Sequence, residues 1–118
     1  MTAPAQLAGN LPLDESGSVL LDANGNGTVV LQPQSSRVTW YVQGAAVSTS
    51  TNAKEPVCNV YNSSRGSKLG GTYTGSQDQI GWTGITIKGG RIIVDWTGGD
   101  AGARAFVTLS GYLTATGR

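Results

Sequence analysis

The acidic side chains are the residues of this sequence best suited to acid–base chemistry, because the chain contains seven Asp and Glu residues and no His. The absence of His excludes the Ser/His/Asp triad, the Cys/His dyad and zinc sites built on His. A glycosidase would need a pair of carboxyl groups that flank the bond it cleaves. The carboxylates that could supply such a pair lie in a predicted arm, in predicted turns or on the polar faces of predicted strands: Asp14, Glu15, Asp22, Asp78, Asp95 and Asp100. The sequence therefore predicts no catalytic residue and a protein that is not an enzyme.

Residues 22–27, DANGNG, match the opening of a calcium-binding loop, in which oxygen ligands alternate along the chain. The twelfth position of such a loop requires a bidentate Glu, and Pro33 stands there. The alternative is a β-hairpin in which residues 23–26 turn between strands at 18–22 and 27–32, because Asn-Gly favours the positive φ of hairpin turns. We therefore expect a hairpin here, and no bound metal or other cofactor.

Cys58 is the single cysteine of the chain, so no intramolecular disulfide can form. Its setting, PVCNVY, is typical of a strand that buries a small side chain. A nucleophilic thiol would need a neighbouring base, and the chain has no His to serve as one. We expect Cys58 to be buried and unreactive.

The aromatic residues could form a platform for sugar rings or a contact between subunits. Trp40 and Trp96 alternate in phase with Val and Ile, so both are expected in the core. Trp82 lies between Gly81 and Thr83 in a predicted loop, where its side chain could be exposed. The candidates for a platform or a subunit contact are Tyr41, Tyr61, Trp82 and Phe106. Their spacing does not distinguish between these two roles.

The strongest strand pattern lies in residues 91–113, RIIVDWTGGDAGARAFVTLSGYL. Apolar and polar residues alternate on both sides of the Gly-rich loop, with Ile92, Val94 and Trp96 on one face of the first strand. We expect these two strands to pair at the centre of a sheet. Eighteen Gly residues and many Ser and Thr residues favour short strands and turns over helices. Residues 18–118 are therefore predicted to form one all-β domain, an antiparallel β-sandwich that is jelly-roll-like, with about seven to nine strands.

Residues 1–17 show neither a strand nor a helix period and contain two Pro residues, which predicts an extended N-terminal arm. The arm carries Leu7, Leu11 and Leu13, and three Leu side chains are more than a solvated linker needs. We expect these residues to contact a neighbouring subunit or a larger assembly, and the arm to be dispensable for folding.

The charges of the chain nearly cancel, because eight basic residues face seven acidic ones and leave a formal charge of +1. Such a balance gives no field that would attract nucleic acid or an anionic membrane surface. The apolar runs are much shorter than the roughly 20 residues of a membrane span, and no signal-peptide pattern is present at the N-terminus. We expect a soluble protein that is synthesised in the cytoplasm and binds neither nucleic acid nor membrane.

Five segments spread over about residues 25–112 carry a resemblance to a known group of proteins: GNGTVVLQP, RVTWYVQGAAVSTST, PVCNVYNSS, GTYTGSQDQ and IIVDWTGGDAGARAFVTLSGY. Together they resemble small all-β virion structural proteins of tailed actinobacterial phages, of the capsid decoration and minor tail types. The resemblance carries over no catalytic residues. It implies a location in the virion, at the capsid surface or the tail, after synthesis in the host cytoplasm.

Within that group, the expected function is that of a capsid decoration protein that binds the outer capsid lattice and stabilises it. Its partners would be the major capsid protein, copies of itself in a homo-oligomer such as a trimer, or both. Two alternatives stay open: a minor tail protein, and a carbohydrate-binding β-sandwich module that contacts host surface glycans. The expected assembly contacts are Leu7, Leu11, Leu13, Tyr61, Trp82 and Phe106.

Overall fold

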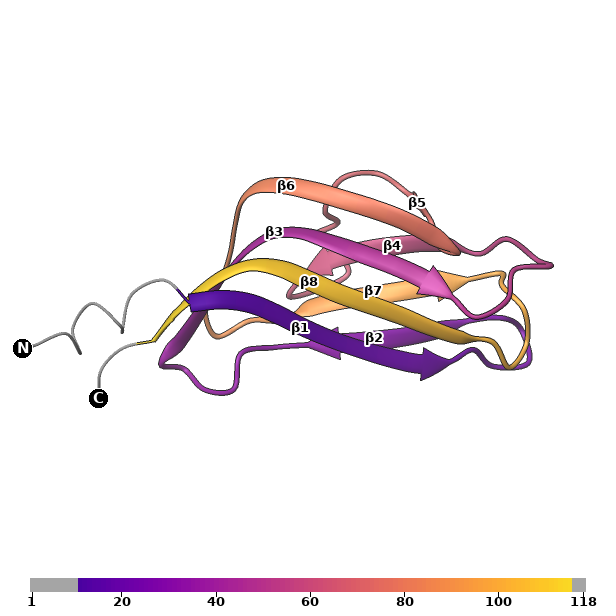
Figure 1. Ribbon diagram of the computed structural model, residues 1–118, viewed down its shortest axis with the longest axis horizontal. Coiled ribbons are helices and arrows are strands. Elements are labelled where there is room, and N and C mark those ends of the chain that lie inside the picture. The colour runs from indigo at the N-terminus through magenta and orange to yellow at the C-terminus, as the bar shows by residue number, and fades with distance from the viewer. Residues whose placement is uncertain (1–10, 116–118) are drawn as a thin grey trace, which may run out of the picture.

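The computed structural model describes residues 11–115, apart from the side chains at positions 83 and 84. Within this range the chain forms eight β-strands and no helix. In chain order they are β1 (Leu11–Leu20), β2 (Gly27–Leu31), β3 (Val38–Thr49), β4 (Val57–Asn62), β5 (Tyr73–Thr74), β6 (Gln77–Ile87), β7 (Ile92–Thr97) and β8 (Arg104–Ala115). Two four-stranded sheets pack face to face, the first in the order β1-β8-β3-β6 and the second in the order β2-β7-β4-β5 (Figure 1).

The strands pair in the manner of one long hairpin that has been rolled up. β1 pairs with β8, β2 with β7, β3 with β6 and β4 with β5, and all four pairs are antiparallel. Rolling this ladder of pairs also places β3 beside β8 and β4 beside β7. This wrapping is the topology of a jelly roll. The predicted fold class, an all-β antiparallel sandwich of the jelly-roll kind, is confirmed.

Alternation along the strands sends one face of each sheet into a shared core. Ile92, Val94 and Trp96 of β7 are buried, and so is Trp40 of β3. The indole Nε1 of Trp96 donates a hydrogen bond to the Gly75 carbonyl oxygen at 3.1 Å, which satisfies the one polar group that this side chain carries into the core. The predicted burial of both Trp residues is confirmed.

The partners of β7 and β8 differ from the prediction. The two strands lie in different sheets, β7 between β2 and β4 and β8 between β1 and β3. The Gly-rich loop carries the chain from one sheet to the other, and backbone hydrogen bonds join Leu21 to Gly102 and Ala103 of that loop. The predicted pairing of these strands is wrong, because alternation indicates which face of a strand is buried and not which strand lies beside it.

The predicted hairpin of residues 18–32 is wrong for the same reason, since β1 pairs with β8 and β2 pairs with β7. The turn itself forms, with Gly25 at φ 78° and its N–H donating to the Asp22 carbonyl oxygen at 2.9 Å. It carries the chain across the sandwich, so that β1 and β2 pack face to face. A Cβ added at Gly17 would lie 2.7 Å from Val29 Cγ1, so only Gly allows this close approach.

The predicted arm of residues 1–17 is too long, because β1 begins at Leu11 and pairs with β8 along its whole length. Leu13 is only 3% exposed and belongs to the core, so its predicted role in assembly is wrong. Pro12 obscured this strand in the sequence, but an edge strand tolerates Pro because its outer N–H groups have no ladder partner. Residues 1–10, which include Leu7, lie outside the described part of the chain.

A bulge crosses the first sheet at Gln43. The register of β3 shifts between Val42 and Gly44 against both of its neighbours, β6 and β8. On β8 the bulge is matched by Gly111, whose φ of 146° brings the position of a Cβ against the Tyr41 carbonyl oxygen. Bulges bend strands, and β3, β6 and β8 curve in Figure 1. The bulge divides the outer face of the first sheet into two halves.

Candidate binding surface on the outer face of the first sheet

On one side of the bulge, the outer face of the first sheet carries small polar side chains in register, which we call the polar strip. It consists of two rows across four strands: Ser18, Phe106, Ser48 and Gln77 in one row, and Ser16, Thr108, Ala46 and Gln79 in the other. Ser48 and Thr108 are half-buried, and the other six residues are exposed. The strip exists because successive side chains alternate between the two faces of a sheet. The residues between strip members are the buried Val47 and Val107 on β3 and β8, and Gly17 and Asp78 on β1 and β6.

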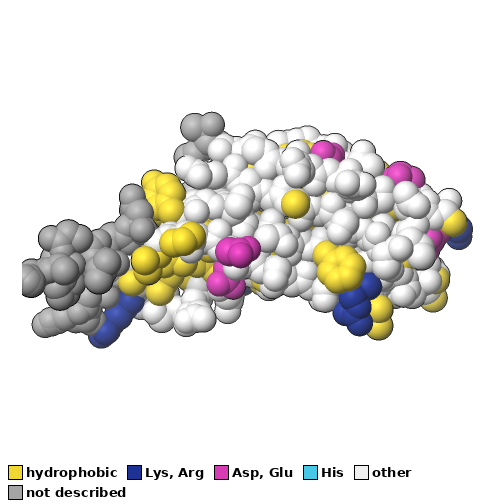
Figure 2. Space-filling view, in the orientation of Figure 1, with side chains coloured by type: hydrophobic (Ala, Val, Ile, Leu, Met, Phe, Trp, Pro, Cys, Tyr) yellow, Lys and Arg dark blue, Asp and Glu magenta, His cyan; other side chains and the backbone are white. Residues whose placement is uncertain are grey.

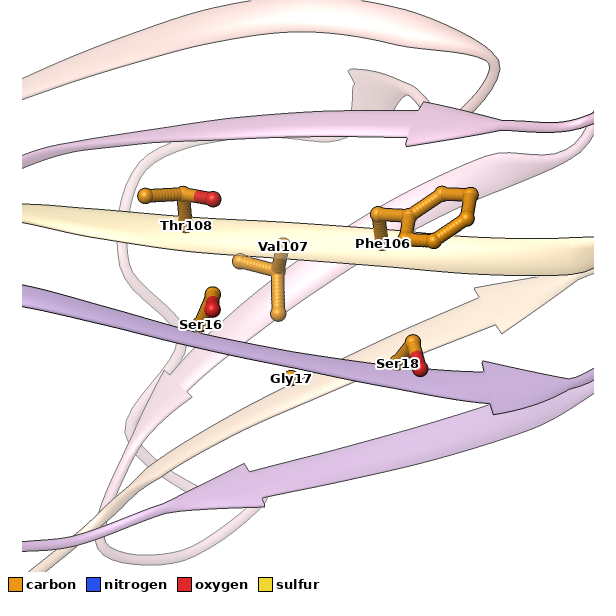
Figure 3. A pocket seen from close by; sticks show the side chains of 6 residues that line it. All are labelled: Ser16, Gly17, Ser18, Phe106, Val107 and Thr108. Atoms are coloured by element: carbon orange, nitrogen blue, oxygen red, sulfur yellow. The ribbon is translucent and has the colours of Figure 1, made fainter.

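The surface of the polar strip is hollowed into shallow depressions. One of about 390 Å³ lies between β1 and β8, with Ser16 and Ser18 on one side and Phe106 and Thr108 on the other (Figure 3). Two neighbouring depressions continue it over β3 and β6, and Thr108 borders all three. The Phe106 side chain is 41% exposed and forms the apolar wall of the first depression. A ligand lying here would meet hydroxyl groups, amide groups and one aromatic ring.

No member of the polar strip is charged, although the Asp78 carboxylate borders the third depression. Arg104 is next along β8, and its Nη1 donates to Ser18 Oγ at 3.2 Å. Asp14 precedes the strip on β1. Asp78, between two strip residues on β6, accepts hydrogen bonds from the backbone N–H groups of Thr74 at 3.1 Å and Gln79 at 2.9 Å. The strip therefore suits an uncharged ligand better than an ionic one.

On the other side of the bulge, Pro12, Tyr41 and Tyr112 lie on the outer face of the sheet. Leu11 alternates with Pro12, so it points to the side of Leu13, but it is exposed at the start of β1. We call these four residues, Leu11, Pro12, Tyr41 and Tyr112, the terminal patch. The rings of Tyr41 and Tyr112 stack with centroids 4.6 Å apart and an angle of 16° between their planes. Register places Pro12 opposite Tyr112, and Leu11, which is 43% exposed, stands at the end of the same strand. Hydrophobic side chains gather at this end of the molecule in Figure 2.

The structure separates the residues predicted as assembly contacts. Leu11 lies in the terminal patch and Phe106 in the polar strip, at opposite ends of the first sheet. Tyr61 is half-buried on β4 in the second sheet, paired with Ile93. Trp82 belongs to β6 rather than to a loop, and its half-buried indole packs against the core and donates to Tyr73 Oη at 3.4 Å. Its predicted loop is wrong, because the neighbouring Gly residues resemble a loop but form part of an irregular strand.

Sequence reasoning missed most of the polar strip and the Tyr112 half of the aromatic stack. The outward Thr108 and Ser110 of β8 carry a signal, since they alternate with the buried Val107 and Leu109. No such signal joins Tyr41 to Tyr112, which lie far apart in the sequence. Their contact depends on the register of β3 against β8, which the sequence pattern does not reveal.

The residues that matched a calcium loop instead close a turn. Asp22 Oδ1 accepts hydrogen bonds from the backbone N–H groups of Asn24 at 2.8 Å and Asn26 at 3.0 Å. Asn26 Oδ1 accepts one from the Gly98 N–H at 3.0 Å, which ties the turn to the loop that follows β7. Among residues 11–115, no group of three or more His, Cys, Asp or Glu side chains is placed to hold a metal ion.

Asp95 is engaged with a loop that crosses the outer face of the second sheet. Arg65 binds it with two hydrogen bonds, Nε to Oδ2 at 2.7 Å and Nη2 to Oδ1 at 2.9 Å, and Thr28 Oγ1 donates to Oδ1 at 2.6 Å. The Arg65 hydrogen bonds are the main cause that lowers the pKa of Asp95, against the opposing effect of burial. The pair fastens the loop of residues 63–72 to the sheet.

Asp100 fastens a second loop. It accepts hydrogen bonds from the Thr51 hydroxyl at 2.8 Å and from the backbone N–H groups of Ala53 at 2.9 Å and Lys54 at 2.7 Å. These donors, the Thr51 hydroxyl first, lower the pKa of Asp100. Asp95 and Asp100 therefore each hold a loop as an ionised acceptor, which is a structural role.

Cys58 is fully buried on β4, as predicted. Burial, with smaller contributions from the negative charges of Asp95 and Asp78, raises the pKa of the Cys58 thiol to about 12. A thiol with so high a pKa is protonated at neutral pH and is a poor nucleophile.

Comparison with known proteins gives no family to which the chain can be assigned. No model of a known protein family matches it, and a search of curated proteins finds no significant match. None of the described residues forms a helix with the length and apolar character needed to cross a membrane.

Proposed function

We propose that this chain is a non-enzymatic structural protein of a phage virion, a capsid decoration protein that binds the outer capsid lattice and stabilises it. The proposal is supported by the resemblance of five segments to small virion proteins and by the jelly-roll topology, a fold that viral capsid domains use. Fold alone does not determine function, so a surface suited to attachment has to carry the proposal.

That surface is the terminal patch. Leu11 is 43% exposed beside Pro12 and the Tyr41–Tyr112 stack, at the end of β1 where residues 1–10 join the domain. Those ten residues include Leu7, the remaining apolar candidate of the predicted arm. An apolar patch continuous with an apolar segment is suited to burial against a protein partner. The partner would be the major capsid protein, a second copy of this chain at a local symmetry axis, or both.

Binding by this patch would be weak for a single copy and stronger in an assembly. Complete burial of a Leu side chain contributes about 1.5–3 kcal/mol, and ordering a flexible segment costs about 1 kcal/mol or more per residue. The net favourable free energy of binding per copy is therefore small. Neighbouring copies that contact one another raise the effective concentration of each. A capsid lattice would therefore retain the protein even though a single isolated contact would not.

The test is reconstitution of purified virions that lack the protein. We expect full-length protein to reach a fixed copy number per particle, and Leu11→Ser, Tyr112→Ser and a deletion of residues 2–10 each to weaken binding about tenfold or more. Val57→Ser is the matched control, because Val57 is 42% exposed but lies on β4 of the second sheet. Virions that take up no protein, or that bind all three variants as tightly as the wild type, would contradict the proposal. Uptake at the tail alone would favour the minor tail alternative.

A further inference from the structure

We propose that the polar strip is a binding site for a neutral glycan, with the Phe106 ring as its apolar platform. The ring is 41% exposed and borders a depression of about 390 Å³. On the same face stand the hydroxyl groups of Ser16, Thr108 and Ser48 and the amide group of Gln79. A pyranose ring offers an apolar C–H face and a rim of hydroxyl groups, so it could stack on Phe106 while its rim meets these polar groups.

The polar groups of the strip are free to bind a ligand. Within residues 11–115, the side chains of Ser16, Ser48, Thr108 and Gln79 make no hydrogen bond to another protein group, whereas Ser18 accepts one from Arg104. Hydroxyl and amide groups both donate and accept, which matches sugar hydroxyl groups that do the same. Because no strip residue is charged, an ionic ligand would lose its hydration and could pair only with Arg104 or Asp78, which already form hydrogen bonds to protein groups.

The composition of the strip favours a glycan over a protein partner. The cores of protein interfaces are enriched in aromatic residues, Met and Arg and depleted in Ser and Ala. Here one aromatic residue is surrounded by Ser, Thr, Ala and Gln side chains. Leu20 and Arg104 form a pair more typical of a protein interface. They lie opposite one another at the far margin of the sheet, outside the depressions.

The geometry of the strip is fixed before a ligand arrives. Its residues stand on four hydrogen-bonded strands, two of them interior strands of the sheet. With strands about 4.8 Å apart, each row extends over about 14 Å, which is long enough for a short oligosaccharide. Side chains held by a sheet lose little freedom on binding, so even a few weak contacts can give measurable affinity.

Glycan binding at the strip is separate from attachment through the terminal patch. From Phe106 to Tyr112, six residues of β8 place the two sites about 20 Å apart, on opposite sides of the bulge. A protein attached to a particle by its terminal patch would leave the strip open to a glycan on another surface.

The probe is a microarray of neutral oligosaccharides of glucose, galactose, mannose and N-acetylglucosamine, with sialylated and uronic-acid oligosaccharides as the charged arm. We expect the wild-type protein to bind at least one neutral glycan. Phe106→Ala should weaken that binding about tenfold or more, and Phe106→Tyr should retain it because the ring remains. Ala46→Arg should also weaken it, because it covers the floor of the strip while Phe106 stays in place. Leu11→Ser, in the terminal patch, is the control and should bind as the wild type does.

Several outcomes would overturn the proposal. They are binding to no neutral glycan, binding to acidic glycans alone, and binding that survives both Phe106→Ala and Ala46→Arg. If Phe106→Ala instead abolishes uptake by virions, the strip is a protein interface and the glycan proposal fails. If the Leu11→Ser variant binds virions poorly but binds glycans normally, attachment through the terminal patch and glycan binding at the polar strip are separate functions, as proposed.

Discussion

At the scale of single residues, the carboxylates show how this chain uses charge. Asp22, Asp95 and Asp100 each accept hydrogen bonds from protein donors and hold a turn or a loop. None of these three lies on the outer face of the first sheet, where the polar strip and the terminal patch are found. These carboxylates therefore maintain the framework, and uncharged side chains form the candidate surfaces.

The Arg65–Asp95 pair should make the stability of the 63–72 loop depend on pH. Since the folded state lowers the pKa of Asp95 from 3.8, its ionised form stabilises the fold above pH 3.8, and this contribution disappears as pH falls through the lower, folded-state pKa. Arg65→Ala should therefore lower Tm by no more than a few degrees at pH 7, because Arg65 is largely exposed. The difference from wild type should shrink in acid, as thermal unfolding monitored by circular dichroism would measure.

Lys88→Ala, which removes an exposed cation between β6 and β7, is the control for that experiment. It should show no comparable pH dependence. If Arg65→Ala lowers Tm by the same amount well below pH 3.8 as at pH 7, the effect comes from packing of the side chain and not from the ion pair.

Cys58 should be inert while the protein is folded. Its thiol is fully buried and has a pKa raised to about 12, so the thiolate is scarce at pH 8 and no reagent can reach it. In the unfolded chain the pKa returns to near 9.0 and the thiol becomes reactive. Ellman's reagent should label the native protein only at the rate of unfolding and label it at once in guanidinium chloride. Fast labelling of the native protein would contradict the burial of Cys58.

At the scale of elements, the sequence predicted strand faces well and strand partners poorly. The alternation of Ile92, Val94 and Trp96 correctly identified the core face of β7. The same alternation on β8 made the two strands look like a pair, although they lie in different sheets. Partner choice depends on how the whole ladder rolls up, and this is a long-range property that no local pattern contains.

The candidate surfaces could be predicted only in part, because local patterns do not show which residues of different strands come together. Leu11 and Phe106 are predicted assembly contacts, and both side chains are exposed. Their grouping with Trp82 and Leu13 was wrong, because Trp82 packs against the core from β6 and Leu13 is a core residue of β1. A residue type and its neighbours indicate burial only after the strand and its inward face are known.

The first strand provides a direct test of the corrected boundary at Leu11. Deletion of residues 2–10 should leave Tm nearly unchanged, whereas deletion of residues 2–15 removes a buried Leu and half of the pairing with β8. Leu13→Ala should cost about 2–5 kcal/mol of unfolding free energy, and Leu11→Ala, at an exposed position, about 0.5 kcal/mol. Chemical denaturation provides these values. Equal costs for the two Leu variants would show that β1 does not dock as described.

The bulge of the first sheet depends on Gly111. A Cβ there would collide with the Tyr41 carbonyl oxygen, and the φ of 146° is unfavourable for any other residue. Gly111→Ala should therefore destabilise the fold by more than about 2 kcal/mol. Gly89→Ala, with φ 73° and open space around its Cβ, should cost only about 1 kcal/mol. A Gly111→Ala variant as stable as Gly89→Ala would mean that the bulge is easily remodelled.

At the scale of the whole molecule, the chain is a nearly neutral jelly roll with two surfaces on one outer face. The formal charge of +1 gives little long-range steering, so recognition has to come from short-range contacts. The terminal patch offers apolar contact at one end of the face, and the polar strip offers hydroxyl groups, amide groups and one ring at the other. This division suits a protein that holds a particle at one end and remains accessible at the other.

The proposed function is that the chain decorates a capsid, and the decisive experiment is cryo-electron microscopy of virions of the phage proposed to encode it. We expect density for the jelly roll at a fixed copy number on the outer capsid, with the Leu11 and Tyr112 end against the shell and the Phe106 end facing outward. Virions that lack the chain, or that carry it only within the tail, would show that it is not a capsid decoration protein.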